Sequence, residues 1–134
     1  DSTWFEVSKG DTKGWANAAF LMPSTEPVDE TARYTKLLGT ARFRSANELT
    51  SALRRAIVNE LKEPSETPFE ARLLGISRAK GSSVALLHVC CMADDSIMGE
   101  QVWLELAEQT ERVTLRRARV SRLCWRGTTT NLCN

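Results

Sequence analysis

The sequence predicts an α+β domain in which N-terminal helices, one of them long and amphipathic, pack on a curved four-stranded antiparallel sheet. Apolar residues recur at helical spacing through residues 45–63, and apolar runs separated by short polar turns fill residues 69–125. The chain has 134 residues, 42% of them hydrophobic and 26% charged. This size and composition suit a single domain over residues 1–134 with one core.

The helical half is expected to cover about residues 1–63. In "GWANAAFLMP", Trp15, Ala19 and Met22 lie at helical spacing, and Pro23 would end the helix. The later string "TARYTKLLG" fits either a short helix closed by Gly39 or an irregular segment.

Residues 45–63 are predicted to form the long helix. The string "SANE" is a capping box, in which Ser45 accepts from the N–H of Glu48 and the Glu48 side chain reaches back to Ser45. Pro64 would end the helix. One face carries the apolar residues Leu49, Leu53, Ala56, Ile57 and Leu61.

The second half, about residues 69–125, is predicted to be an antiparallel meander with strands at 69–78, 84–92, 101–107 and 113–125. "AKGSS" and "EQTER" are turn signals, and "ADDSIMGE" is expected to be a longer connection. The run "VALLHVCCM" is apolar at successive positions, which is typical of a central strand buried on both faces.

Position distinguishes the four cysteines more than their number does. Cys90 and Cys91 lie inside an apolar run, whereas Cys124 and Cys133 lie in the polar tail, residues 124–134. A disulfide between the tail cysteines would remove two exposed thiols and stabilise the fold by roughly 2.5–3 kcal/mol. Two thiols in a reducing compartment and a metal site are the alternatives, and four cysteines allow three pairings.

The strings "DDSIMGEQVWLEL" and "RLCWRGTTTNLC" resemble the carboxyl half of a group of small exported bacterial proteins, many of them periplasmic proteins or lipoproteins. The resemblance covers residues 69–134. It implies a cone-shaped fold, as in cystatin-like and nuclear-transport-factor-like domains, and a Cys124–Cys133 bridge. It also implies a periplasmic or secreted location, with any membrane anchor in a segment upstream of Asp1. No apolar run approaches the ~20 residues of a membrane-spanning helix.

Charge is segregated along the last third of the chain. Residues 94–111 hold six acidic side chains and no basic one, and residues 112–126 hold six arginines and no acidic one. Either the two segments neutralise each other across paired strands, or the arginines form an exposed patch that binds an acidic partner. The patch would consist of Arg116, Arg117, Arg119, Arg122, Trp125 and Arg126.

The sequence gives little support for a catalytic or a metal site. His88 is the one histidine, and only Asp94 and Asp95 follow it closely as candidate orienting carboxylates. His88 and Cys90 would share a strand face, but Cys124 and Cys133 do not complete a zinc ligand spacing, and "ADDSIMGE" lacks calcium-loop spacing. We expect no metal and no cofactor. With a net charge of +1 we expect no nucleic-acid partner either.

The leading hypothesis is a non-catalytic exported protein that binds a protein partner in the bacterial envelope, such as a toxin-immunity or enzyme-inhibitor protein. One alternative is a small-ligand-binding domain, or an isomerase or hydrolase that uses His88. Another is a structural subunit of an envelope assembly.

Overall fold

The computed structural model describes residues 4–17, 24–61, 70–90, 96–125, 128–129 and 132–133. Within these residues, two helices and nine strands follow one another. They are β1 Trp4–Lys9, β2 Thr12–Asn17, β3 Val28–Asp29, α1 Thr31–Leu38, α2 Ala46–Glu60, β4 Glu70–Ala79, β5 Ser82–Cys90, β6 Ile97–Gln109, β7 Arg112–Cys124, β8 Thr128–Thr129 and β9 Leu132–Cys133.

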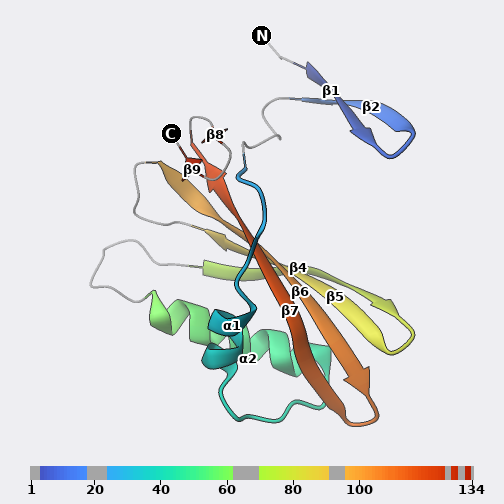
Figure 1. Cartoon of the computed structure of the whole chain (residues 1–134), viewed down its shortest axis with the longest axis vertical. Helices are drawn as coiled ribbons and strands as arrows, with labels where there is room; N and C mark the ends of the chain where they lie inside the picture. Colours follow the sequence, from blue (N-terminus) through green and yellow to red (C-terminus); the bar gives the residue numbers. More distant parts are fainter. Residues whose placement is uncertain are drawn as a thin grey trace.

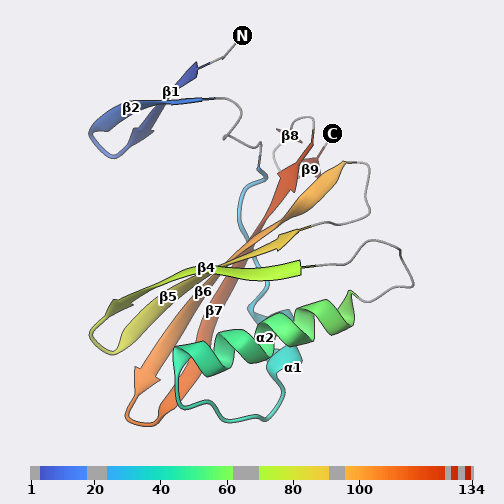
Figure 2. The same ribbon diagram turned by 180° about the vertical axis from the view of Figure 1, so that it is seen from behind.

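A twisted five-stranded antiparallel sheet forms the main body. Its strand order is β3-β7-β6-β5-β4, so the four long strands are neighbours in chain order and the short β3 pairs with the outer side of β7. Helices α1 and α2 lie on one face of this sheet (Figure 1). In the opposite view, α2 lies nearer the viewer than the long strands and crosses them (Figure 2). We call the face toward the helices the inner face and the opposite face the outer face.

The predicted fold class was wrong, because the first half of the chain is not a helical half. Strand accounts for 60% of the described residues and helix for 22%. The large sheet has five strands rather than four, and two small two-stranded sheets accompany it. The cone-shaped arrangement of a helix on a four-stranded sheet is therefore not the fold of this chain.

The N-terminal error has a local cause. Trp15, expected to start a helix, lies in strand β2, which pairs with β1 in a tight hairpin. Ala19 and Met22 lie outside the described residues. Gly10 occupies the turn with a φ of 58°, a conformation that glycine adopts without steric cost. The turn string "KGDT" was the hairpin signal, whereas three apolar residues at spacings of three and four are weak evidence for a helix.

The four strands predicted for the second half are present as β4 to β7, with shifted ends. Strand β6 begins at Ile97, inside the segment that was expected to be a connection. Gly99 permits this, because a Cβ at residue 99 would overlap the carbonyl oxygen of Val89 on β5. The register between β6 and β7 shifts at the same place, between Ile97 and Gly99.

Helix α2 follows its sequence signals closely. The Ser45 hydroxyl accepts from the N–H of Glu48 at 3.1 Å. The Glu48 carboxylate accepts from the N–H of Arg44 at 2.8 Å, one residue earlier than the capping box predicts. Pro64, expected to end the helix, lies outside the described residues. The string "TARYTKLLG" resolves into the helical alternative, with α1 closed by Gly39.

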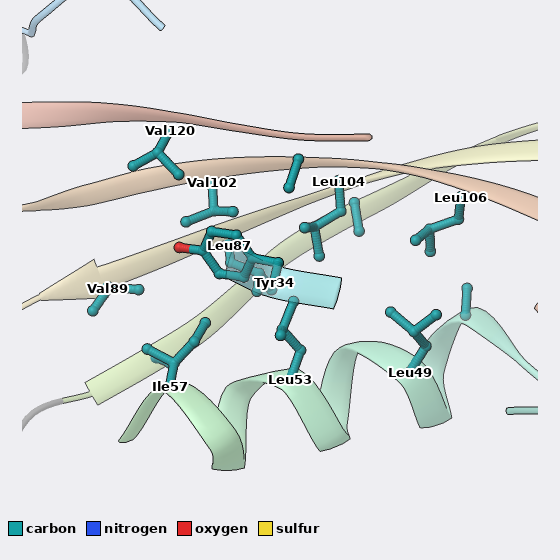
Figure 3. Close-up of a cluster of buried hydrophobic side chains, with 14 of the residues drawn as sticks. Tyr34, Leu49, Leu53, Ile57, Leu87, Val89, Val102, Leu104, Leu106 and Val120 are labelled. Atoms are coloured by element: carbon teal, nitrogen blue, oxygen red, sulfur yellow. The ribbon is translucent and has the colours of Figure 1, made fainter. Parts of the chain in front are cut away.

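The core lies between helix α2 and the inner face. Leu49, Leu53 and Ile57 of α2 are at most 1% exposed, and Tyr34 of α1 packs beside them (Figure 3). Strand register aligns inner side chains in rows, such as Leu87, Val102 and Val120 across β5, β6 and β7. The rest of the core cluster from the long strands is Ala71, Ala85, Val89, Leu104, Leu106, Val113 and Ala118.

Candidate functional site

Strand β5 is apolar on both faces, but the described part of the chain covers only its inner face. Ala85, Leu87 and Val89 point to the inner face and are fully buried. The alternate residues Val84 and Leu86 point to the outer face, where Val84 is 43% exposed and Leu86 is half-buried. The prediction of a strand apolar on both faces holds, but no described element packs on the outer face (Figures 1 and 2).

The centre of the outer face is a row of side chains across four strands. Strand register places Leu86 of β5 opposite Trp103 of β6, Trp103 opposite Arg119 of β7, and Arg119 opposite Asp29 of β3. Leu86, Trp103 and Arg119 are each half-buried. Leu74 is exposed and lies at the irregularity of β4, just before Gly75, which pairs with Leu86. An aromatic, an arginine and aliphatic side chains thus share one open surface.

Two of the predicted arginines lie on this outer face and have acidic neighbours. Arg117 Nε lies 3.3 Å from Asp29 Oδ2, and Arg119 Nη2 lies 3.7 Å from Glu105 Oε1. The Thr31 N–H donates to Asp29, and together with the Thr31 hydroxyl and Arg117 it lowers the pKa of that carboxyl. Exposed pairs of this kind contribute little to stability, and a partner's carboxylate can compete for them.

The other members of the predicted arginine patch are not brought together with these two. Arg122 lies opposite Glu100, two positions from the inner-face residue Val120, and so belongs to the inner face. Arg116 is exposed at the register shift of β7. Trp125 is 56% exposed beyond the end of β7, and Arg126 lies outside the described residues. The aromatic residue between the arginines and the aliphatic side chains is Trp103, which the sequence reasoning did not select.

His88 also lies on the outer face, between Arg72 of β4 and Gln101 of β6. Its Nε2 atom is buried, and within the described part of the chain it has no hydrogen-bond partner. The two expected orienting residues, Asp94 and Asp95, lie outside the described residues. The described geometry therefore gives His88 a place on the surface but no catalytic partner.

A polar cluster, which we call the Arg33 cluster, joins α1, α2 and β6 at one end of the core. Its members are Glu30, Arg33, Tyr34, Glu60 and Glu100. Arg33 Nη1 lies 2.9 Å from Glu30 Oε2, and Arg33 Nη2 lies 3.0 Å from Glu60 Oε2. The guanidinium also lies 5.4 Å from the centre of the Tyr34 ring. Sequence reasoning missed this cluster because its members come from distant segments with no shared local pattern.

Burial and charge shift the pKa values in the Arg33 cluster. Burial raises the pKa of Glu100, which is 7% exposed, although Arg33 and Arg122 act in the opposite direction. Burial and the charge of Glu100 raise the pKa of Tyr34, whose buried hydroxyl has no partner among the described residues. Burial acts to lower the pKa of Arg33, but its hydrogen bonds to Glu30 and Glu60 outweigh burial and raise it. Within this cluster, the ion pair between Arg33 and Glu60 joins α1 to the end of α2.

The tail cysteines are bonded to each other. Cys124 and Cys133 form a disulfide with their Cα atoms 5.2 Å apart, as the resemblance implied. Their sequence neighbours Trp125 and Leu132 are both strongly exposed, so apolar surface also accompanies the disulfide. Cys91 lies outside the described residues.

The disulfide is compatible with an extracellular or periplasmic protein. Neither α1 nor α2, the helices of the described residues, is long and apolar enough to cross a membrane. In the same part of the chain, no three acidic, histidine or cysteine side chains gather closely enough to hold a metal ion.

Comparison of the chain with protein-family models, with curated proteins and with solved structures found no match. The resemblance to small exported bacterial proteins therefore stays a prediction.

Proposed function

We propose that this chain is a non-catalytic binding domain of the bacterial envelope, periplasmic or secreted, whose ligand is another protein. One observation carries the proposal, namely that strand β5 is apolar on both faces while the helices cover only one. An antiparallel sheet with one face in water normally carries polar residues on that face. Val84, Leu86 and Trp103 break this rule side by side.

The composition of the outer face supports a protein ligand. Tryptophan and arginine are the residues that most often dominate binding energy at protein interfaces, and here Trp103 and Arg119 are direct neighbours. Arg117 adds a second guanidinium on the same face. The partner we expect presents an apolar side chain for the Leu86–Trp103 surface and a carboxylate for the arginines.

The disulfide supports the proposed compartment, because such bonds persist where the surroundings are oxidising. A small, disulfide-bonded protein with one binding face is suited to block a toxin or an enzyme in that compartment. This role as an immunity or inhibitor protein is the form of the proposal that we favour.

The test places a photo-crosslinking amino acid at Leu86 in cells that naturally make the protein. The matched control places it at Asn59, an exposed position of α2. We expect the Leu86 probe to give one discrete adduct with a second protein, and the Asn59 probe to give none. No adduct, or the same adducts from both positions, would overturn the proposal. An adduct between two copies of this chain would instead indicate that the outer face mediates self-association.

Purified partner then provides the quantitative test. Trp103→Ala should weaken binding by roughly 30-fold or more, the loss of about 2 kcal/mol typical of an interface hot spot. Trp15→Ala, which removes an exposed tryptophan from the β1–β2 hairpin, should change the affinity less than about twofold. Equal effects of the two substitutions would show that the outer face is not the binding surface.

A further inference from the structure

A hollow lies on the helix side of the molecule, where the connection between α1 and α2 passes the start of β7. Its volume is about 280 Å³. In Figures 1 and 2 the connection runs from α1 to the end of the sheet that carries the β6–β7 turn. The hollow is lined by residues of α1, the connection, α2 and the start of β7. We propose that it binds a small organic anion with an apolar body, such as a short-chain or aromatic carboxylate.

The walls are held by backbone contacts. Gly39 ends α1 with a φ of 62°, so the chain turns away from the helix axis into the connection. At its far end the Val113 N–H of β7 donates to the Phe43 carbonyl at 2.8 Å. Ser45 then caps α2. Because the connection is fixed at both ends, the hollow is formed before any ligand arrives.

The floor of the hollow is apolar. Leu49 of α2 is fully buried, and Val113 of β7 is 4% exposed. Leu38 and Leu115, both partly buried against the core, also line the hollow. The floor is therefore a continuation of the core and would contact the apolar body of a ligand.

The rim is cationic. Arg42 of the connection and Arg112 of β7 both line the hollow, and among the described residues no acidic side chain does. Neither arginine forms an ion pair with a carboxylate of the described residues. A carboxylate bound at this rim would accept charge-assisted hydrogen bonds from the guanidinium groups. Thr40 of the connection also lines the hollow, and its hydroxyl offers a further donor at the same site.

The size restricts the ligand class. Sites for drug-sized molecules span roughly 300–1,000 Å³, so this hollow is just below that range. Hexanoate and benzoate fit the description of a small body with one carboxylate, and both are simple probes. The proposal does not depend on the protein-binding function proposed above, because none of Leu86, Trp103, Arg117 and Arg119 lines the hollow.

The experiment is a titration of the ¹⁵N-labelled protein with hexanoate and benzoate, followed through its amide NMR signals. We expect saturable shifts of Gly39, Phe43 and Val113 at millimolar ligand. The neutral amides hexanamide and benzamide should bind about tenfold more weakly, because they lack the charge that the arginines recognise. Inorganic phosphate, which lacks an apolar body, should also bind more weakly than hexanoate.

Matched arginine variants separate this site from general attraction of anions. The double substitution Arg42→Gln with Arg112→Gln should weaken hexanoate binding by about tenfold or more. Arg78→Gln with Arg116→Gln removes the same charge from exposed positions that do not line the hollow, and should leave binding unchanged. Equal losses in both pairs, no saturable shifts, or phosphate binding as tightly as hexanoate would each overturn the proposal.

Discussion

Removal of the tail disulfide tests how the end of the chain contributes to stability. Cys133→Ala is the cleanest perturbation, because Cys133 is half-buried whereas Cys124 is 1% exposed and stays in place. The bond joins cysteines separated by nine positions, so it closes a loop of ten residues. The chain-entropy relation gives about 2.7 kcal/mol for such a loop at 25 °C. For a chain of this size we expect the melting temperature to fall by on the order of 10 °C.

The assay is urea unfolding followed by tryptophan fluorescence and circular dichroism. Reduced wild-type protein should unfold with the same midpoint as Cys133→Ala, because both lack the same covalent loop. The reasoning would be refuted by a loss of stability below about 0.5 kcal/mol, which would mean that the tail is already ordered without the bond. It would equally be refuted if Cys133→Ala lost all cooperative unfolding, because a ten-residue loop closure does not account for so large an effect.

Three further predictions concern the sheet, the helix and the buried carboxylate. Gly99→Ala should destabilise the fold by about 2 kcal/mol or more, because its Cβ meets the Val89 carbonyl oxygen, whereas Gly14→Ala, with open space around it, should cost much less. Ser45→Ala should cost about 1 kcal/mol in urea unfolding through loss of the α2 cap. Burial raises the pKa of Glu100 above its usual 4.5, so its contribution to stability is present below that pH and is lost as pH rises through the folded-state pKa. The stability of Glu100→Gln relative to wild type should therefore increase from about pH 4 to pH 7, and a constant difference would contradict the argument.

Helix α2 could be predicted because its signals are local and agree with one another. The cap at Ser45 and the apolar stripe through Leu49, Leu53 and Ile57 all indicate the same helix, and the structure places that stripe in the core. The N-terminal segment could not be predicted in the same way. There Trp15 satisfied a loose helical spacing, while the turn at Gly10 set the pairing of β1 with β2.

The candidate site was predicted in part. Charge segregation pointed to Arg117 and Arg119, and strand pairing then separated them from Arg122, because alternate residues of β7 face opposite sides. The interpretation in which residues 94–111 and 112–126 neutralise each other applies to Arg119, which pairs with Glu105, whereas Arg117 pairs with Asp29 outside the acidic segment. Trp103 was missed because its place beside Arg119 depends on the pairing of β6 with β7. The Arg33 cluster depends on tertiary contacts that no sequence window contains.

The sequence of β5 is apolar on both faces, whereas the described fold covers only one of them. A run apolar at successive positions needs cover on both faces, since a half-buried Leu86 and a 43% exposed Val84 forgo part of the roughly 1.5–3 kcal/mol that full burial of a large aliphatic side chain contributes. Helix α2 supplies cover on one side only, and the residues beside Leu86 on the other side are Trp103 and, next to it, Arg119. The pattern that was expected to mark a fully buried strand is therefore the basis on which we propose the outer face as a surface for a second protein. If a partner buries this face, its apolar pattern is explained without a further layer in the chain.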